Sequence, residues 1–159
     1  MRLLKEVLLK VYTLEKKQKV SRNILNVFNF FSKPENLSII TPKKLDFKIT
    51  TSSPVDMKEG TLIDYTIKIM TVPVRWRTLI SKYDPPNLFV DKQLKGPYLM
   101  WEHTHTFKKI NNNETLIQDI VKYSLPYSFI GNIVNALYVK RDLKNIFSYR
   151  KEKIKEIFN

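Results

Sequence analysis

The chain has 159 residues, no cysteine and a formal net charge of +13. This length is typical of one domain with a substantial core, and a hydrophobic fraction of 43% with 12% aromatic residues excludes a disordered chain. Without cysteine there are no disulfides, no thiolate metal ligands and no cysteine nucleophile, which fits a reducing cytoplasm.

The net positive charge can reflect a solvated basic surface or a surface that binds an anionic partner. Lysine is abundant and scattered along the chain, which favours a solvated basic surface. Weak contact with an anionic membrane surface is the alternative. Nucleic acid is not expected, because the sequence lacks arginine–glycine runs, zinc-ligand spacing and ribonucleoprotein-type motifs. No apolar run approaches the roughly 18 residues of a membrane span, and charged residues interrupt the N-terminal leucines, so we expect no cleaved signal peptide.

The N-terminal part of the chain predicts a strand and two short helices. Residues 5–15 are rich in Val, Leu, Tyr and Thr and predict the first strand, and the charged residues 16–19 are expected to end it. Ser21 is the expected N-cap of a helix with an apolar face, which Pro34 ends. Residues 35–40 then predict a second short helix.

The middle of the chain predicts an antiparallel sheet. Apolar and polar residues alternate there with a period of two, and turn residues separate six such runs. Short connections favour an antiparallel meander, and the first strand brings the sheet to seven strands. The six predicted strands lie at residues 45–49, 61–69, 74–80, 89–94, 99–107 and 115–123.

Residues 128–158 predict one long helix, because apolar residues recur along them every three or four positions. Additional apolar residues widen this face in the first half only, so we expect that half to be the more deeply enclosed. Arg150 falls on the apolar face, where its stem would lie along the core and its head would reach water. The order of elements predicts an α+β fold with a cavity between a curved sheet and this helix.

The predicted hairpin of residues 89–107 carries both histidines of the chain. Because strand side chains alternate between two faces, its second strand places two large aromatic side chains and both imidazoles on one face, which we expect to point inward. Polar residues of the first strand alternate in the same way and need hydrogen bonds if they point inward. The residues concerned are Asp91 and Gln93 on the first strand, and Trp101, His103, His105 and Phe107 on the second.

Three kinds of chemistry are open to this histidine pair. Two histidines two residues apart on a strand can bind a metal with a carboxylate from Asp91, Asp119 or Glu102, but the chain has no third histidine and we predict no metal. An imidazole oriented by a carboxylate can act as a general acid or base. A polar network that satisfies itself inside a ligand-binding cavity is the third interpretation, and the one we favour.

The acid–base interpretation depends on strand register. A symmetric turn at residues 111–114 would place His105 opposite Asp119 on the next strand. The same pairing would place Trp101 opposite Tyr123. The candidate catalytic residues are therefore His103, His105 and Asp119.

Several short motifs are spread along the chain: Val27-Phe28-Asn29-Phe30-Phe31, Pro34-Glu35-Asn36-Leu37, Ile40-Thr41-Pro42, Gly60-Thr61-Leu62-Ile63-Asp64-Tyr65, Val72-Pro73-Val74-Arg75-Trp76, Phe89-Val90-Asp91-Lys92-Gln93, Lys95-Gly96-Pro97-Tyr98, Trp101-Glu102-His103-Thr104-His105-Thr106-Phe107 and Phe147-Ser148-Tyr149-Arg150. With these motifs, residues 5–158 resemble the START/Bet v 1-like (SRPBCC) superfamily. Within it, they resemble most the bacterial ligand-binding, polyketide-cyclase-like proteins.

The resemblance implies a single helix-grip domain over residues 1–159, in which a seven-stranded curved antiparallel sheet wraps around a long C-terminal helix, with two short helices after the first strand. It implies a hydrophobic or amphipathic ligand, lipid-like or aromatic and polyketide-like, between sheet and helix. It carries over no cofactor and no catalytic residue, because activities differ widely across the superfamily. The alternative is a cyclase, dehydratase or hydrolase that uses His103 or His105. The expected ligand-contacting residues are Tyr65, Trp76, Asp91, Gln93, Trp101, His103, His105, Phe107, Tyr123, Ile133 and Leu137.

Overall fold

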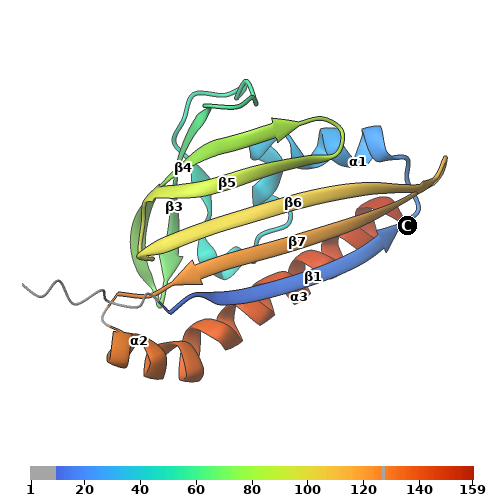
Figure 1. The fold of residues 1–159 in the computed structure, drawn as a ribbon. Helices are drawn as coiled ribbons and strands as arrows, with labels where there is room; N and C mark the ends of the chain where they lie inside the picture. The colour runs from blue at the N-terminus through green and yellow to red at the C-terminus, as the bar shows by residue number, and fades with distance from the viewer. Residues whose placement is uncertain (1–9, 127) are drawn as a thin grey trace, which may run out of the picture.

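One curved antiparallel sheet and a long C-terminal helix make up most of the protein. The computed structural model describes residues 10–126 and 128–159. Figure 1 shows the sheet bending around the helix α3 (Lys140–Phe158). The strands are β1 (Tyr12–Val20), β2 (Lys48–Ile49), β3 (Leu62–Ile69), β4 (Val72–Asp84), β5 (Leu88–Lys95), β6 (Met100–Asn111) and β7 (Glu114–Ser124). Their order in the sheet is β1-β7-β6-β5-β4-β3-β2, so β2 to β7 form a meander and β1 pairs with β7. This confirms the predicted α+β fold with seven antiparallel strands.

The first strand differs from its prediction at its C-terminal end. Residues 16–19 do not end the strand but continue it to Val20. β1 is an edge strand whose outer face is open to water, so exposed lysines can alternate there with half-buried side chains. Residues 5–9 of the predicted strand lie outside the described residues.

The second predicted strand is much shorter than expected. Of residues 45–49, only β2 pairs in the sheet. The chain before it forms a 3-10 turn, η2 (Lys43–Leu45), and Asp46 ends this turn with a left-handed backbone, at a φ of 45°. The alternation of apolar residues predicted a strand here, but the local turn takes precedence.

Two short helices follow β1, as predicted, but with other ends. The first is α1 (Ile24–Phe31), and its N-cap is Asn23 rather than Ser21. The Asn23 side chain accepts a hydrogen bond of 2.9 Å from the backbone N–H of Asn26, which satisfies one of the free N–H groups at the helix start. The second is a 3-10 helix, η1 (Pro34–Ser38), which ends two residues earlier than predicted.

The C-terminal helical region is continuous but contains a π-helical turn. It consists of α2 (Ser128–Val134), the π-helical η3 (Asn135–Val139) and α3. The prediction that its first half is more deeply enclosed is wrong: Ile130 is 62% exposed and Leu137 is 74% exposed. In Figure 1, α2 lies beyond the ends of β1 and β7, so the sheet does not cover it. Within the described residues, no helix is long and apolar enough to cross a membrane.

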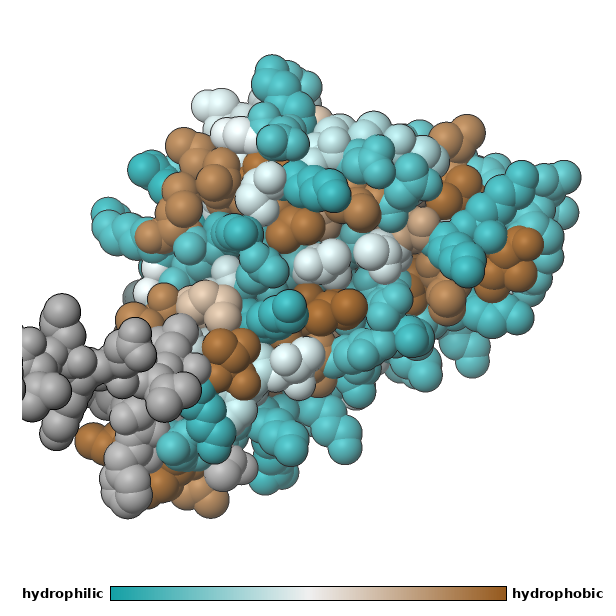
Figure 2. Space-filling model, in the orientation of Figure 1, coloured by the Kyte–Doolittle hydropathy of each residue, from teal (hydrophilic) through white to brown (hydrophobic). Residues whose placement is uncertain are grey.

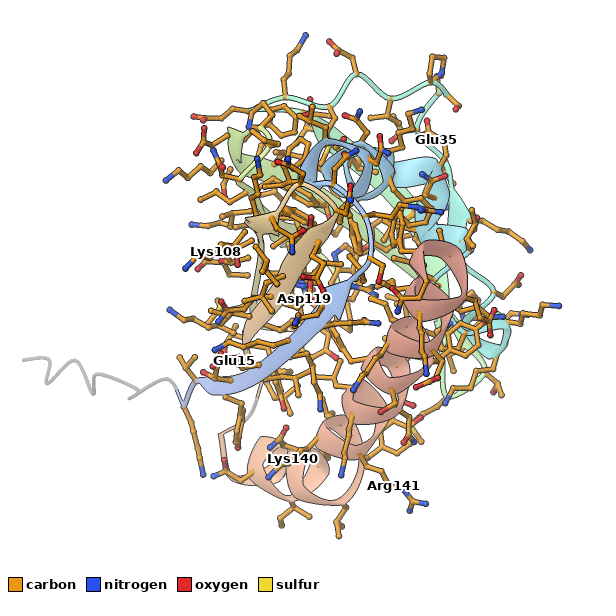
Figure 3. The ribbon with its side chains drawn as sticks, turned by 90° about the vertical axis from the view of Figure 1, so that its right-hand side faces the viewer. Glu15, Glu35, Lys108, Asp119, Lys140 and Arg141 are labelled. Carbon is orange, nitrogen blue, oxygen red and sulfur yellow. The ribbon has the colours of Figure 1, made fainter. Side chains whose placement is uncertain are left out.

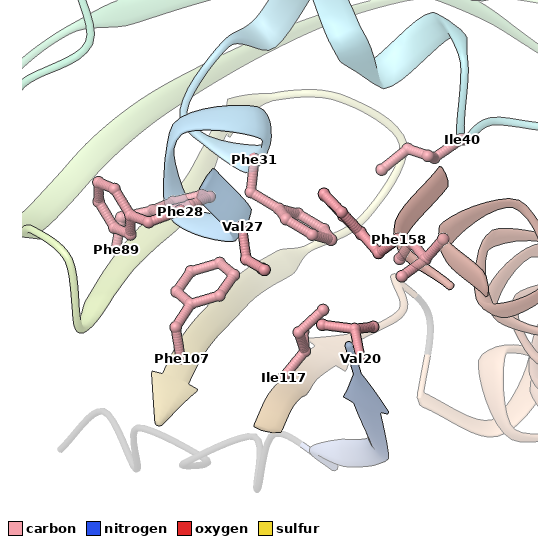
Figure 4. Close-up of a cluster of buried hydrophobic side chains, with 10 residues drawn as sticks. Val20, Val27, Phe28, Phe31, Ile40, Phe89, Phe107, Ile117 and Phe158 are labelled. Carbon is pink, nitrogen blue, oxygen red and sulfur yellow. The ribbon is translucent and has the colours of Figure 1, made fainter. Parts of the chain in front are cut away.

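A hydrophobic cluster fills the space between the sheet and the C-terminal end of α3 (Figure 4). Phe28 of α1 lies at its centre, with its ring 5.4 Å from that of Phe107 on β6 and 6.1 Å from that of Phe89 on β5. Ile154 and Phe158 of α3 complete the cluster. This end of the interior is therefore largely packed with side chains.

Candidate functional site

The inner face of the sheet carries both histidines, as the alternation predicted. His103 and His105 on β6 are 5% and 4% exposed. The register places His103 opposite Asp91 of β5 and His105 opposite Asp119 of β7. The predicted pairing of His105 with Asp119, and of Trp101 with Tyr123, is confirmed. Figure 3 shows Asp119 on the side of the sheet that faces α3.

These two histidines and two aspartates form a closed arrangement, which we call the His–Asp ring: Asp91, His103, His105 and Asp119. The two imidazoles stack with their centroids 3.7 Å apart. The Nε2 atom of His103 lies 2.8 Å from Oδ1 of Asp119, and Nε2 of His105 lies 2.8 Å from Oδ2 of Asp91. The Nδ1 atom of His105 lies 3.1 Å from Asp119, and that of His103 lies 3.7 Å from Asp91. Each imidazole nitrogen therefore faces a carboxylate.

The ring shifts the pKa values of its members in different directions. Burial would raise the pKa of the Asp119 carboxyl, but hydrogen bonds from both imidazoles outweigh it and lower that pKa. The pKa of Asp91 is lowered in the same way. Burial, together with the neighbouring His105, lowers the pKa of His103. For His105, contacts with both carboxylates outweigh burial and raise the pKa. The ring thus favours two carboxylates, one imidazolium and one neutral imidazole.

Arg150 of α3 is the other charged group in the interior. The residue is only 8% exposed, and its guanidinium carbon lies 4.8 Å from the centre of the Phe147 ring. The expectation that its head reaches water is therefore wrong. The guanidinium enters the space that also borders Asp91 and His103, where the excess negative charge of the His–Asp ring attracts it. Among the described residues, its Nε and Nη1 atoms have no hydrogen-bond partner.

A cavity of about 400 Å³ lies between the inner face of the sheet and the α2–α3 region. Four aromatic side chains in mutual contact form one wall, with ring centroids 4.8 to 5.8 Å apart along the series. Leu143 and Phe147 of α3 form part of the opposite wall. A smaller cavity of about 130 Å³ adjoins it and shares His103 and Arg150. The four aromatic residues are Tyr65, Trp76, Tyr98 and Trp101.

The structure brings six of the predicted ligand-contacting residues to these cavities. Tyr65, Trp76, Trp101 and His103 border the larger one, and Asp91 and His105 border the smaller one. Sequence reasoning missed Tyr98, which was treated only as part of a turn, and Arg150. The signal for Arg150 was its position on the apolar face of the helix.

Five other predicted residues lie elsewhere. Phe107 packs in the hydrophobic cluster at the other end of the interior. The Tyr123 hydroxyl donates a hydrogen bond of 2.7 Å to Oδ1 of Asn135. The Gln93 side chain bonds to the backbone of Tyr98, with its Nε2 atom donating to the carbonyl oxygen at 2.7 Å, and so braces the β5–β6 hairpin. The remaining two, Ile133 and Leu137, are 48% and 74% exposed on the helix.

One group of described residues has the donor atoms for a metal ion. Asp91, His103 and His105 each offer an atom within 4.8 Å of the others. The same atoms already face one another or Asp119 in the His–Asp ring, so a metal ion would have to displace these contacts.

Comparison with known proteins finds similarity in structure but not in sequence. No protein-family model matches the chain, and no curated protein sequence does. Norcoclaurine synthase from Thalictrum flavum, in complex with dopamine and hydroxybenzaldehyde, is 15% identical with a TM-score of 0.67, over 96% of this chain and 91% of that one. Major latex-like protein 151 from Panax ginseng is 10% identical with a TM-score of 0.68, over 93% and 97% of the two chains. An aromatase/cyclase from Streptomyces sp. R1128 is 10% identical with a TM-score of 0.65, over 91% and 94%.

These similar structures are Bet v 1-like proteins, and their likeness extends over nearly the whole of each chain. The protein therefore has the helix-grip fold that the resemblance in sequence predicted. At 10–15% identity the likeness shows the fold, and any function must be argued from the site.

The His–Asp ring predicts two very different histidine titrations. NMR spectroscopy of the two imidazoles should show one pKa above the usual value of 6.5, for His105, and one below it, for His103. The substitution His105→Asn leaves one imidazole signal and so assigns both. Because the pKa of His105 is raised in the folded state, its stabilising contribution is lost as the pH rises through that value. Two histidines that titrate together near 6.5 would contradict the ring.

Proposed function

We propose that this protein binds a hydrophobic or amphipathic small molecule in the cavity between the sheet and α3. The observation that carries the proposal is the cavity itself, because about 400 Å³ with a largely apolar wall is within the usual range for small-molecule sites. Similar structures support it: one is a complex of norcoclaurine synthase with two small aromatic compounds, and another is an aromatase/cyclase.

Removal of apolar surface from water would supply most of the binding free energy. The aromatic wall offers large side chains that hold one another in place, since Trp76 contacts Tyr65, Tyr98 and Trp101. Such a wall loses little conformational entropy when a ligand binds. Each Å² of apolar surface buried contributes about 25 cal/mol, so a ligand that covers this wall gains several kcal/mol.

An enzyme that uses His103 or His105 as a general acid or base is the alternative. His103 borders the larger cavity, which favours it. However, each imidazole nitrogen lies within 3.7 Å of a carboxylate oxygen, so a substrate proton would have to compete with those contacts. An activity that His103→Leu abolishes, with a pH profile that inflects at a histidine pKa, would favour the enzyme over the binding protein.

Trp101→Ala should weaken ligand binding far more than it destabilises the fold. Trp101 borders the cavity, whereas Phe107, six residues further along the same face of β6, lies in the hydrophobic cluster. With the neutral apolar dye Nile red as ligand, we expect Trp101→Ala to lower affinity about tenfold, since it removes much of one wall.

The matched control is Phe107→Ala. It should reduce the free energy of unfolding by about 3–5 kcal/mol, measured by urea denaturation, yet leave dye affinity of the folded protein nearly unchanged. Equal effects of the two substitutions on affinity would argue against this cavity as the binding site.

We further propose that the protein takes its ligand from an anionic membrane surface. Exposed apolar side chains project from the helical region at the cavity rim, where Ile130 and Val134 border the cavity and Leu137 is 74% exposed. Figure 2 shows some brown atoms at this corner of the molecule. The basic residues Lys140 and Arg141 follow directly in the chain, and Figure 3 shows them at the same end of the helix. An apolar patch beside basic residues suits a lipid surface of negative charge.

Binding to vesicles tests this second proposal. The protein should sediment with vesicles that contain phosphatidylserine and not with neutral phosphatidylcholine vesicles, and raised salt should release it. Leu137→Glu should reduce sedimentation, while Leu25→Glu, at another exposed site on α1, should not. Vesicle binding that is insensitive to salt, or an equal loss of sedimentation in both variants, would contradict the membrane proposal.

A further inference from the structure

The buried guanidinium of Arg150 is the least satisfied polar group of the interior. The residue is 8% exposed, and within the described residues its Nε and Nη1 atoms are buried without a hydrogen-bond partner. Buried guanidinium groups are normally paired, because leaving donors without partners costs free energy. This arginine borders both cavities, so its side chain adjoins the space that the proposed ligand would fill.

The acidic residues nearest to Arg150 are already engaged. Asp91 and Asp119 lie within 2.8 Å of imidazole nitrogens in the His–Asp ring. Asp142, another acidic residue that borders the cavity, forms an ion pair of 3.0 Å with Lys44. No ion pair joins Arg150 to any described carboxylate. The Nε and Nη1 donors of Arg150 therefore remain for an acceptor group that comes from outside the chain.

Resting on the proposed binding function, we propose that the cavity takes an amphipathic carboxylate, whose carboxylate binds to the Arg150 guanidinium and whose apolar part lies along the aromatic wall. The planar fork of a guanidinium matches the two oxygens of a carboxylate. The Phe147 ring covers the guanidinium at 4.8 Å and shields the pair from water, which strengthens their attraction.

The charge of the site favours a single negative charge over two. Arg150 supplies one positive charge, while the neighbouring His–Asp ring has two carboxylates and favours one imidazolium. These charges sum to zero, so every negative charge of a ligand is in excess beside Asp91 and Asp119, and a phosphate monoester with two such charges is disfavoured more than a carboxylate with one. A monoanionic carboxylate is therefore the better match.

The length of the cavity suits an extended tail. Tyr138 and Arg150 both border it, and the twelve residues between these positions correspond to about 18 Å of helix at 1.5 Å per residue. A carboxylate at Arg150 would therefore direct its tail toward Tyr138 and the exposed rim. A medium-length fatty acid, or an elongated aromatic acid, has these dimensions.

The test compares two ligands that differ only in the head group. Nile red is bound first, and dodecanoate or the neutral dodecan-1-ol is then used to displace it from the wild-type protein. We expect dodecanoate to displace the dye at a concentration about tenfold lower than the alcohol, because a charge-assisted pair forms with Arg150. Equal displacement by both, with the dye bound, would overturn the carboxylate proposal and leave the binding function intact. Absence of dye binding would overturn both.

Three variants sharpen the test. Arg150→Met should bind Nile red but lose the preference for dodecanoate, and Arg150→Lys should keep part of it because the charge remains. Lys144→Met, which removes an exposed positive charge from the same helix, should behave as the wild type. Preserved preference in Arg150→Met would overturn the proposal, as would tighter binding of dodecyl phosphate than of dodecanoate. If Arg150→Met does not fold, the test rests on the preference for dodecanoate in the wild type and on its reduction in Arg150→Lys.

Discussion

Two aspartates on the inner face of the sheet are the constraint on which the rest of the structure depends. Asp91 and Asp119 come from β5 and β7, and both contact histidines of β6, the strand between them. A shift of one residue in either pairing would turn the imidazoles outward and leave carboxylates unpaired in the interior, which is strongly destabilising. The His–Asp ring therefore fixes the register of three central strands, and with it the face on which the aromatic wall stands.

The interior divides into a packed end and an open end. At one end α1 covers the sheet and the last turns of α3 complete a hydrophobic cluster, which provides stability. At the other end the helical region stands away from the sheet and leaves the cavity. Arg150 lies between the two ends. The nearby His–Asp ring stabilises its positive charge, while its Nε and Nη1 donors have no partner among the described residues and can bind an anion. The same residue thus links the charge balance of the core to ligand recognition.

Local sequence patterns predicted the sheet and the pairing of His105 with Asp119. The features that they did not predict depend on packing between distant parts of the chain. Alternation placed His103 and His105 inward, and a symmetric turn placed His105 opposite Asp119, because both features depend on neighbouring residues. Phe107 shares the face of Trp101 but lies outside the cavity, since α1 covers that end only. The burial of Arg150 was also not predictable, because it depends on how far the sheet covers the helix. The Gln93 side chain donates a hydrogen bond to the backbone of Tyr98, and the sequence pattern does not specify the hairpin geometry that makes this bond possible.

Native mass spectrometry of the purified protein tests the central claim most directly. We expect a species heavier than the bare chain, and denaturing extraction should release a small amphipathic acid whose mass equals the difference. The Arg150→Met protein, prepared in parallel, should carry less of it. A wild-type protein that shows only the bare mass, and stays so when dodecanoate is offered in excess, would contradict the account.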